Sequence, residues 1–236
     1  MLFALLFWLI TYFGRDPLDG FPRVVLWAWE RPEDLRFLSP DRAGVAYLAA
    51  TVRVYGDQFG VRPRMQPLRV QPHTPLIAVV RIETPQAVRP AWETLDDIAK
   101  AIVSAAGLSE VRALQIDFDA RESEREWYRE LLRRLRKQMP ARVPLTITAL
   151  VSWCGQDAWM DGLPVADASP MMFRMGKGEY APVRDFERPL CRSSVGLSTD
   201  EWPARVPRGR RLYIFHPRSW MARDYEGAIS MARRWQ

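Results

Sequence analysis

Histidine and cysteine are the scarcest chemistry-bearing residues of this 236-residue sequence. The histidines are His73 and His216, and the cysteines are Cys154 and Cys191. Structural and catalytic zinc sites need three or four ligands at characteristic spacings, and the cysteine spacing matches none of them. We therefore expect no zinc site and no cofactor. Whether the cysteines pair stays open at this point: export would favour a disulfide, and a cytosolic location would favour two buried thiols.

Lysine is also rare, although the formal net charge is +6. The lysines are Lys100, Lys137 and Lys177, so arginine carries almost all of the positive charge. The arginines are scattered along the chain, singly or in adjacent pairs. They form no basic block, and they are not interleaved with the aromatic residues that nucleic-acid-binding surfaces use. We expect no nucleic-acid partner.

Linkers, low-complexity tracts and internal repeats are absent from the sequence. We expect an apolar N-terminal segment (residues 1–20) followed by one domain (residues 21–236). Residues 1–13, MLFALLFWLITYF, are uninterruptedly apolar. They are fewer than the roughly 20 residues that cross a bilayer as a helix. The length suits a signal-peptide core, but a basic start and a small-residue cleavage site are missing.

Residues 1–13 have two further interpretations. They could form a first element that packs on the domain, or they could belong to an anchor that begins farther upstream. We favour export, to the periplasm or with membrane attachment through residues 1–13.

Short apolar strands alternate with polar or amphipathic segments along the rest of the chain. Eight strands are predicted, at residues 24–29, 45–55, 75–82, 113–120, 144–150, 169–175, 192–198 and 211–217. Helices are predicted between or after them, at residues 32–38, 94–108, 123–139 and 224–235. Eight β-then-α units of this size indicate an α/β fold, a single (β/α)8 TIM-type barrel with some short or missing helices. The other candidate, an open doubly wound sheet, lacks its Gly-rich phosphate turn.

The fourth strand, LQIDFDA, carries carboxylates on one of its two faces. Alternation along a strand puts Leu114, Ile116 and Phe118 on the face that meets the helices. Asp117 and Asp119 therefore share the inward face near the carboxyl end, where TIM barrels place their active sites. Glu30, at the end of strand one, and Glu83, at the end of strand three, supply further carboxylates.

Aromatic and basic side chains follow the other strand ends. Trp29 and Trp153 are candidates for stacking on sugar rings, and Arg81, Arg174 and His216 for polar contacts with a substrate. Two carboxylates beside aromatic platforms are what glycoside hydrolysis needs, one as acid and one as nucleophile, base or stabiliser. We assign these roles to Asp117 and Asp119, with Glu30 or Glu83 as the alternative second carboxylate.

Three other uses of the mouth stay open. Arginines could neutralise the aspartates in a purely structural network. A non-catalytic barrel could bind carbohydrate or protein there, and a hydrolase could hold magnesium or calcium with the four carboxylates.

The blocks VLWAWERPEDLRFL, LQIDFDARESE, LTITALVSWC and SPMMFRMG resemble a bacterial family known mainly as a domain of unknown function. The resemblance covers roughly residues 23–220. It implies a TIM-barrel-like domain in envelope-associated proteins, without an established activity.

A weaker similarity joins the fourth strand to the family-18 glycoside hydrolases, whose pattern there is D-x-x-D-x-D-x-E. When the central aspartates are matched to Asp117 and Asp119, Leu114 replaces the first aspartate and Arg121 replaces the catalytic glutamate. Glu122 comes one residue too late, and we expect it to begin a helix with Glu124. The similarity implies an acidic strand end, and the departure at Arg121 argues against chitinase-type chemistry.

Overall fold

The computed structural model describes residues 18–85, 88–155, 157–175 and 185–235. Residues 1–13, expected to direct export or attach the chain to a membrane, lie outside the described residues. No helix within the described ranges is both long and apolar enough to cross a membrane.

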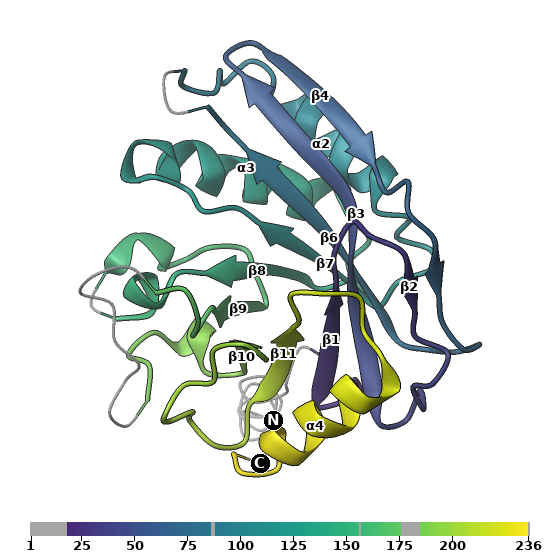
Figure 1. Cartoon of the computed structure of the whole chain (residues 1–236). Helices are drawn as coiled ribbons and strands as arrows, with labels where there is room; N and C mark the ends of the chain where they lie inside the picture. Colours follow the sequence, from purple (N-terminus) through teal and green to yellow (C-terminus); the bar gives the residue numbers. More distant parts are fainter. Residues whose placement is uncertain (1–17, 86–87, 156, 176–184, 236) are drawn as a thin grey trace, which may run out of the picture.

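Eight parallel strands follow one another around a barrel in their order along the chain. They are β1 (Val24–Ala28), β3 (Ala43–Tyr55), β6 (Leu76–Glu83), β7 (Ala113–Asp117), β8 (Leu145–Ala149), β9 (Asp167–Pro170), β10 (Ser194–Ser198) and β11 (Arg211–Phe215). Each corresponds to one of the strands predicted from sequence, and the predicted TIM-type barrel is confirmed (Figure 1). The largest shift in position is at β9, which begins two residues before its predicted start and ends at Pro170.

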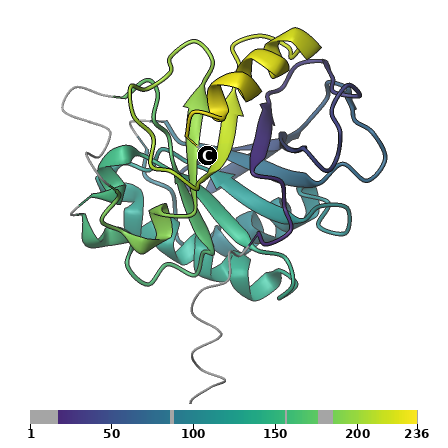
Figure 2. The same ribbon diagram turned by 90° about the horizontal axis from the view of Figure 1, so that it is seen from below.

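The barrel is nearly closed between β9 and β10. Met171, just after β9, forms a parallel bridge with Gly196, and the Met172 amide donates to the Gly196 carbonyl at 2.8 Å. A Cβ atom at Gly196 would lie 2.4 Å from the Met171 sulfur, so a larger residue there would require the Met171 side chain to shift. Figure 2, which shows the molecule turned by 90°, gives a second view of the strands and the segments around them.

Alternation along the strands separates an inner from an outer core. The inner core contains Trp27, Leu48, Val79 and Tyr213, and Phe21 lies with them. In β7, Leu114 and Ile116 instead belong to the outer core, as predicted, together with the buried faces of the helices. The inner face of β7 is thereby left to Ala113, Gln115 and Asp117.

Three α-helices lie in the described part of the chain: α2 (Leu95–Ala105), α3 (Arg125–Gln138) and α4 (Ala222–Ala232). The 3.6-residue period of α3 buries Tyr128, Leu131, Leu132 and Leu135 completely. Hydrophobic residues recurring at this spacing form one apolar stripe, which is what makes this segment helical in its tertiary context. The helices predicted at residues 94–108, 123–139 and 224–235 are confirmed.

The connection after the second barrel strand is a hairpin rather than a helix. β3 runs beyond the barrel and pairs antiparallel with β4 (Gln58–Pro63), through a turn at Gly56 and Asp57. Gly56 has φ of +63°, a value that glycine adopts readily. Figure 1 shows β4 beside α2.

The helix predicted at residues 32–38 is wrong. Glu33 and Asp34 form the short strand β2 (Glu33–Asp34), which pairs with β5 (Leu68–Arg69). Leu35 and Leu38 are fully buried. Their three-residue spacing, which is also typical of a helix, here arises in an irregular buried segment. A pairing partner more than thirty residues away is invisible to a local pattern.

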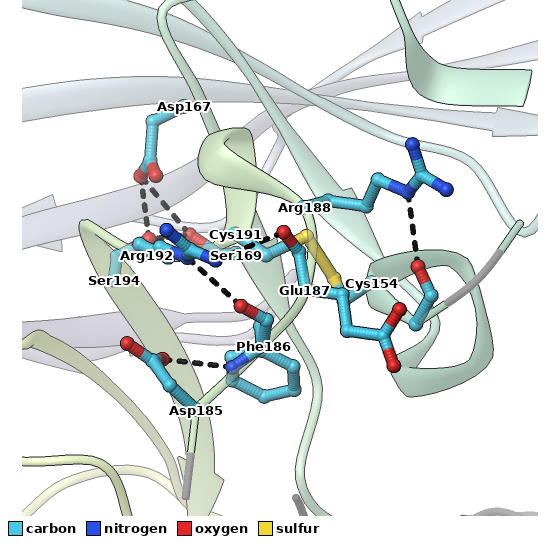
Figure 3. The surroundings of a disulfide bond; sticks show 11 residues. Cys154, Asp167, Ser169, Asp185, Phe186, Glu187, Arg188, Cys191, Arg192 and Ser194 are labelled. Atoms are coloured by element: carbon cyan, nitrogen blue, oxygen red, sulfur yellow. Dashed lines mark hydrogen bonds between the residues drawn. A yellow bond between two sulfur atoms is a disulfide. The ribbon is translucent and has the colours of Figure 1, made fainter. Parts of the chain in front are cut away.

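Short 3-10 helices lie in the connections after β7, β8 and β9: η1 (Glu122–Glu124), η2 (Val151–Cys154), η3 (Ala158–Met160) and η4 (Pro189–Cys191). Cys154 in η2 and Cys191 in η4 form a disulfide, with their Cα atoms 5.8 Å apart. Figure 3 shows this bond and the neighbouring Arg188, whose Nε donates to the Gly155 carbonyl at 2.9 Å. The disulfide thus joins the connection after β8 to the one before β10.

Candidate functional site

Arg81 is the centre of the charged groups at the carboxyl ends of the strands. It lies opposite Asp117 in the β6–β7 register, and its Nη1 donates to Asp117 Oδ2 at 2.6 Å. Thr148 Oγ1 on β8 donates to the other oxygen, Oδ1, at 2.9 Å. Asp119 Oδ2 lies 3.8 Å from Arg81 Nη2. The structure therefore brings both aspartates to one arginine on the inner face of the mouth.

A third carboxylate, Glu83, extends this charged row. Its oxygens lie 3.7 Å from Arg81 Nε and 2.8 Å from Arg53 Nε. Burial lowers the pKa of Arg81, but the carboxylates of Asp117, Asp119 and Glu83 outweigh it and leave that pKa raised. Arg81 therefore stays a cation that fixes the positions of three carboxylates.

The aspartates differ in exposure. The Asp117 side chain is 10% exposed, whereas that of Asp119 is 62% exposed. Both line a hollow of about 430 Å³ at the mouth. Its other lining residues are Trp29, Arg81, Leu150, Met171, Phe173, Arg174 and Phe215. The hollow thus combines three aromatic side chains with acidic and basic groups.

Trp29 is part of an aromatic group that reaches into the barrel. Its ring centroid lies 5.9 Å from that of Phe215 and 5.6 Å from that of Trp27. Phe173 contacts Phe215 from the other side, with centroids 4.8 Å apart. Because Trp27 is buried and Trp29 is half-buried, this stack presents Trp29 at the mouth.

Three predicted site residues are placed differently from expectation. Trp153 is 1% exposed and packs edge-on against Trp159, so a sugar ring has no access to it. Glu30 Oε1 accepts from the backbone amides of Met65 and Gln66, and this side chain does not line the hollow.

Arg174 lies beyond the end of β9 rather than within a strand. It has φ of +49°, and its amide donates to Glu201. Its side chain is 71% exposed at the edge of the hollow.

His216 lines a neighbouring hollow of about 200 Å³, which shares Trp29, Phe173, Arg174 and Phe215 with the first. His216 Nδ1 is 2.6 Å from Thr199 Oγ1, and Nε2 is 3.6 Å from Asp224 Oδ2. Burial lowers the pKa of His216, and the nearby Asp224 only partly opposes this. The imidazole is therefore biased towards its neutral form.

Arg121 occupies the position at which the family-18 pattern has its glutamate. Its guanidinium pairs with Glu124, and its amide donates to Glu124 Oε2 at 2.8 Å. Thr84 Oγ1 donates to the same carboxylate at 2.7 Å. Arg121 and Glu124 thus form a cap at the start of η1, as expected for a helix-start glutamate.

Several residues of the mouth were not predicted from the sequence. Thr148 follows Thr146 at inward positions of β8, so strand alternation could have identified it. Phe173 and Phe215 looked like ordinary packing residues. Arg53, which binds Glu83, carried no local signal because its partner lies on another strand.

Within the described ranges, no group of three or more His, Cys, Asp and Glu side chains is arranged to hold a metal ion. The four carboxylates considered for magnesium or calcium are instead bound by arginines and backbone amides.

Taken together, these residues define a TIM-type barrel whose mouth joins an aromatic stack to an arginine–carboxylate row. Residues 72–173 match the family model described as Domain of unknown function (DUF3142), which includes the blocks LQIDFDA and LTITALVSWC. The resemblance to a domain-of-unknown-function family is thereby confirmed for this part of the chain.

Among solved structures, the Bacillus cereus spore cortex-lytic enzyme SleL is similar, with 15% sequence identity and a TM-score of 0.48. The similar region covers 76% of this chain and 52% of the SleL chain, so this chain spans about half the length of SleL. No curated protein matches the sequence.

Proposed function

We propose that the protein binds carbohydrate at the barrel mouth, without cleaving it, and that it works outside the cytosol. The hollow of about 430 Å³ supports binding, because it offers Trp29 as a stacking surface. Asp119 and Arg81 stand beside Trp29 as hydrogen-bonding groups. Binding sites for small molecules commonly combine an apolar, aromatic lining with a few polar groups that fix orientation.

The single observation that favours binding over hydrolysis is the position of Arg81. Glycoside hydrolysis needs a carboxylic acid that can give a proton to the leaving oxygen. Both oxygens of Asp117 instead accept hydrogen bonds, from Arg81 and Thr148. Glu83 is bound by Arg53, and Arg121 replaces the glutamate of the family-18 pattern. The groups around the mouth therefore suit recognition better than proton transfer.

Hydrolysis is the second candidate, and the exposure of Asp119 favours it. This carboxylate is 62% exposed, faces the hollow, and lies two residues after Asp117. In this reaction, Asp119 would be the acid, and Asp117, held by Arg81, would stabilise the positive charge that develops on the sugar. Water would then add to that sugar carbon, and Asp119 would recover its proton from the water.

The disulfide supports work outside the cytosol. Disulfides persist in oxidising compartments and are rare in the cytosol, where thiols are kept reduced. Cys154 and Cys191 account for both cysteines of the sequence. We propose an envelope glycan as the ligand for this reason, with the apolar segment of residues 1–13 directing export or attachment.

The proposal is tested by titrating the full-length protein, in detergent micelles, with soluble envelope glycan fragments in a calorimeter. Trp29→Ala should weaken binding about tenfold, because a lost aromatic contact of this kind is worth about 1 kcal/mol or more. Trp92→Ala is the matched control, since Trp92 is 51% exposed and does not line the hollow. Equal losses in both variants would contradict the assignment of the mouth.

The two candidates are separated by measuring new reducing ends released from the same glycans. We expect none from the wild-type protein. If reducing ends appear and Asp119→Asn abolishes them while binding is kept, hydrolysis replaces binding as the function.

A further inference from the structure

The β3–β4 hairpin carries an exposed polar face beyond the barrel mouth. We define the hairpin face as Arg53, Tyr55, Gln58, Gly60 and Arg62. All five residues are exposed. Between them, Val52 and Val54 are fully buried and Phe59 and Val61 pack on the outer core, as alternation along the two strands requires.

The strand register places these residues on one side of the hairpin. Arg53 pairs with Gly60, and Tyr55 pairs with Gln58, across the β3–β4 ladder. Directly paired residues of an antiparallel ladder point to the same side. Arg62 joins them opposite Thr51, which precedes Arg53 by two positions.

The hairpin face is continuous with the hollow at the mouth. Arg53 lies opposite Glu83 in the β3–β6 register and binds it at 2.8 Å. Glu83 is two residues from Arg81 on β6, and Arg81 binds Asp117 inside the hollow. A row of contacts therefore leads from Asp117 onto the hairpin without an intervening apolar segment.

The hairpin face is long and uncovered. From Thr51 to Tyr55 the strand advances about 13 Å, at roughly 3.3 Å per residue. A Cβ atom at Gly60 would meet no other heavy atom within 4 Å, so no side chain covers the centre of the face. Tyr55, 51% exposed, supplies an aromatic ring at its far end. These features suit an extended chain better than a single sugar ring.

The charge of the hairpin face indicates the kind of chain. Arg62 is exposed and makes no ion pair with any residue of the described ranges. Arg53 shares its charge with Glu83, and its side chain remains 53% exposed. A guanidinium donates in a planar fork that matches a carboxylate in a bidentate arrangement. A glycan that carries carboxylates fits these groups.

We propose that the hairpin face binds an acidic polysaccharide, whose chain continues from the mouth across Arg53 and Arg62 to Tyr55. This inference rests on the proposed function, because it extends the carbohydrate site of the mouth. It adds the ligand class, a carboxylated glycan, and the direction in which the chain lies.

Tri- and octagalacturonate, which are polymers of a carboxylated sugar, are the probes for calorimetric titration of the full-length protein in detergent micelles. Octagalacturonate should bind about tenfold more tightly than trigalacturonate, an advantage equivalent to about 1.4 kcal/mol. Arg62→Ala and Tyr55→Ala should remove this advantage and leave trigalacturonate binding unchanged. Lys100→Ala, on α2 with a 69% exposed side chain, should change neither affinity.

The alternative outcomes separate this inference from the function on which it rests. Equal affinities for the two lengths, or an unchanged length dependence in Arg62→Ala, would overturn the hairpin face alone. Binding of octadextran, a neutral oligosaccharide, without binding of either galacturonate would overturn the acidic ligand while keeping the carbohydrate site. Absence of binding to all three probes would overturn the acidic ligand of the hairpin face, and the titration with envelope glycan fragments tests the carbohydrate site separately.

Discussion

The Arg81 guanidinium and the Asp117 carboxylate meet at 2.6 Å between β6 and β7, inside the mouth of the barrel. The Asp117 side chain is almost buried, so water has little access to its interactions. The Asp119 side chain, at the end of the same strand, is mostly exposed to water. Arg81 thus contacts two aspartates that differ strongly in exposure.

Asp117→Ala should lower the free energy of unfolding by about 2 kcal/mol, because hydrogen bonds to charged groups are worth about 1.5–3 kcal/mol. Asp119→Ala should lower it by less than about 0.5 kcal/mol, as is usual for exposed ion pairs at this distance. Urea denaturation of both variants measures the difference. Equal losses would show that Arg81 does not distinguish the two aspartates.

Glu124 should be more important for folding than its neighbour Glu122. Its side chain is 1% exposed and accepts from Thr84 and from the amide of Arg121. Without this carboxylate, the Arg121 amide and the Thr84 hydroxyl lose their acceptor, and a polar group left unsatisfied in this way costs about 1–3 kcal/mol. Glu124→Ala should therefore destabilise by about that amount in urea denaturation.

The matched control is Glu122→Ala, two residues earlier in the same 3-10 turn, where the side chain is exposed. Surface substitutions of this kind change stability by about 0.5 kcal/mol or less. A similar loss in both variants would mean that the general negative charge of the helix start, rather than the Arg121–Glu124 contact, stabilises this turn.

The strand pattern was sufficient to predict the barrel. Most of the eight strands are apolar runs that are buried on both faces, as is typical of parallel strands. Such runs can be recognised in the sequence because their apolar residues follow one another within a single segment. The buried stripe of Tyr128, Leu131 and Leu135 in α3 likewise follows from the spacing of residues within one segment.

Non-local contacts account for what the sequence did not predict. Residues 32–38 have helical spacing, but Glu33 pairs with Leu68 and its carboxylate accepts from the Trp220 amide at 2.9 Å. The second barrel strand continues into a hairpin because β4 returns along it, which no pattern within β3 indicates. Trp153, expected at the mouth, is enclosed by Trp159, a residue of the following 3-10 helix.

The sequence predicted which strand ends form the candidate site, but not the contacts made there. Alternation placed Asp117 on the inner face, but it could not show that Arg81 and Thr148 bind its two oxygens. The three partners lie on three different strands, and only the folded barrel brings them into contact. The chemistry of the mouth is therefore a tertiary property, even where its residues are visible in the sequence.

The Cys154–Cys191 disulfide should stabilise the connections around β9. The bond closes a loop with a sequence separation of 37 residues. In the chain-entropy model a loop of this length is worth about 4 kcal/mol at 25 °C. The double variant Cys154→Ser/Cys191→Ser should lose about 2–4 kcal/mol in urea denaturation.

Thiol titration of the denatured wild-type protein, purified from an oxidising compartment, provides the control for this bond. We expect no reactive thiol before reduction and both thiols after it. Reactive thiols before reduction would contradict the pairing.

His216 should make stability fall in mildly acidic solution. Burial lowers the pKa of the folded-state imidazole below its ordinary value of 6.5, so the unfolded chain binds this proton more readily. As pH falls from above 6.5 towards the lowered folded-state pKa, the free energy of unfolding should decrease, and below that pKa this contribution should level off. The charged groups that act on the ring are Asp224, Arg218, Arg31 and Asp200.

His216→Gln should reduce this slope in denaturation experiments across that pH window, because the titrating group is gone. His73→Asn is the matched control: His73 is exposed, and its φ of +64° is one that asparagine tolerates. This control should keep the part of the slope that His216 causes. An unchanged slope in His216→Gln would mean that groups other than this buried imidazole cause the acid sensitivity.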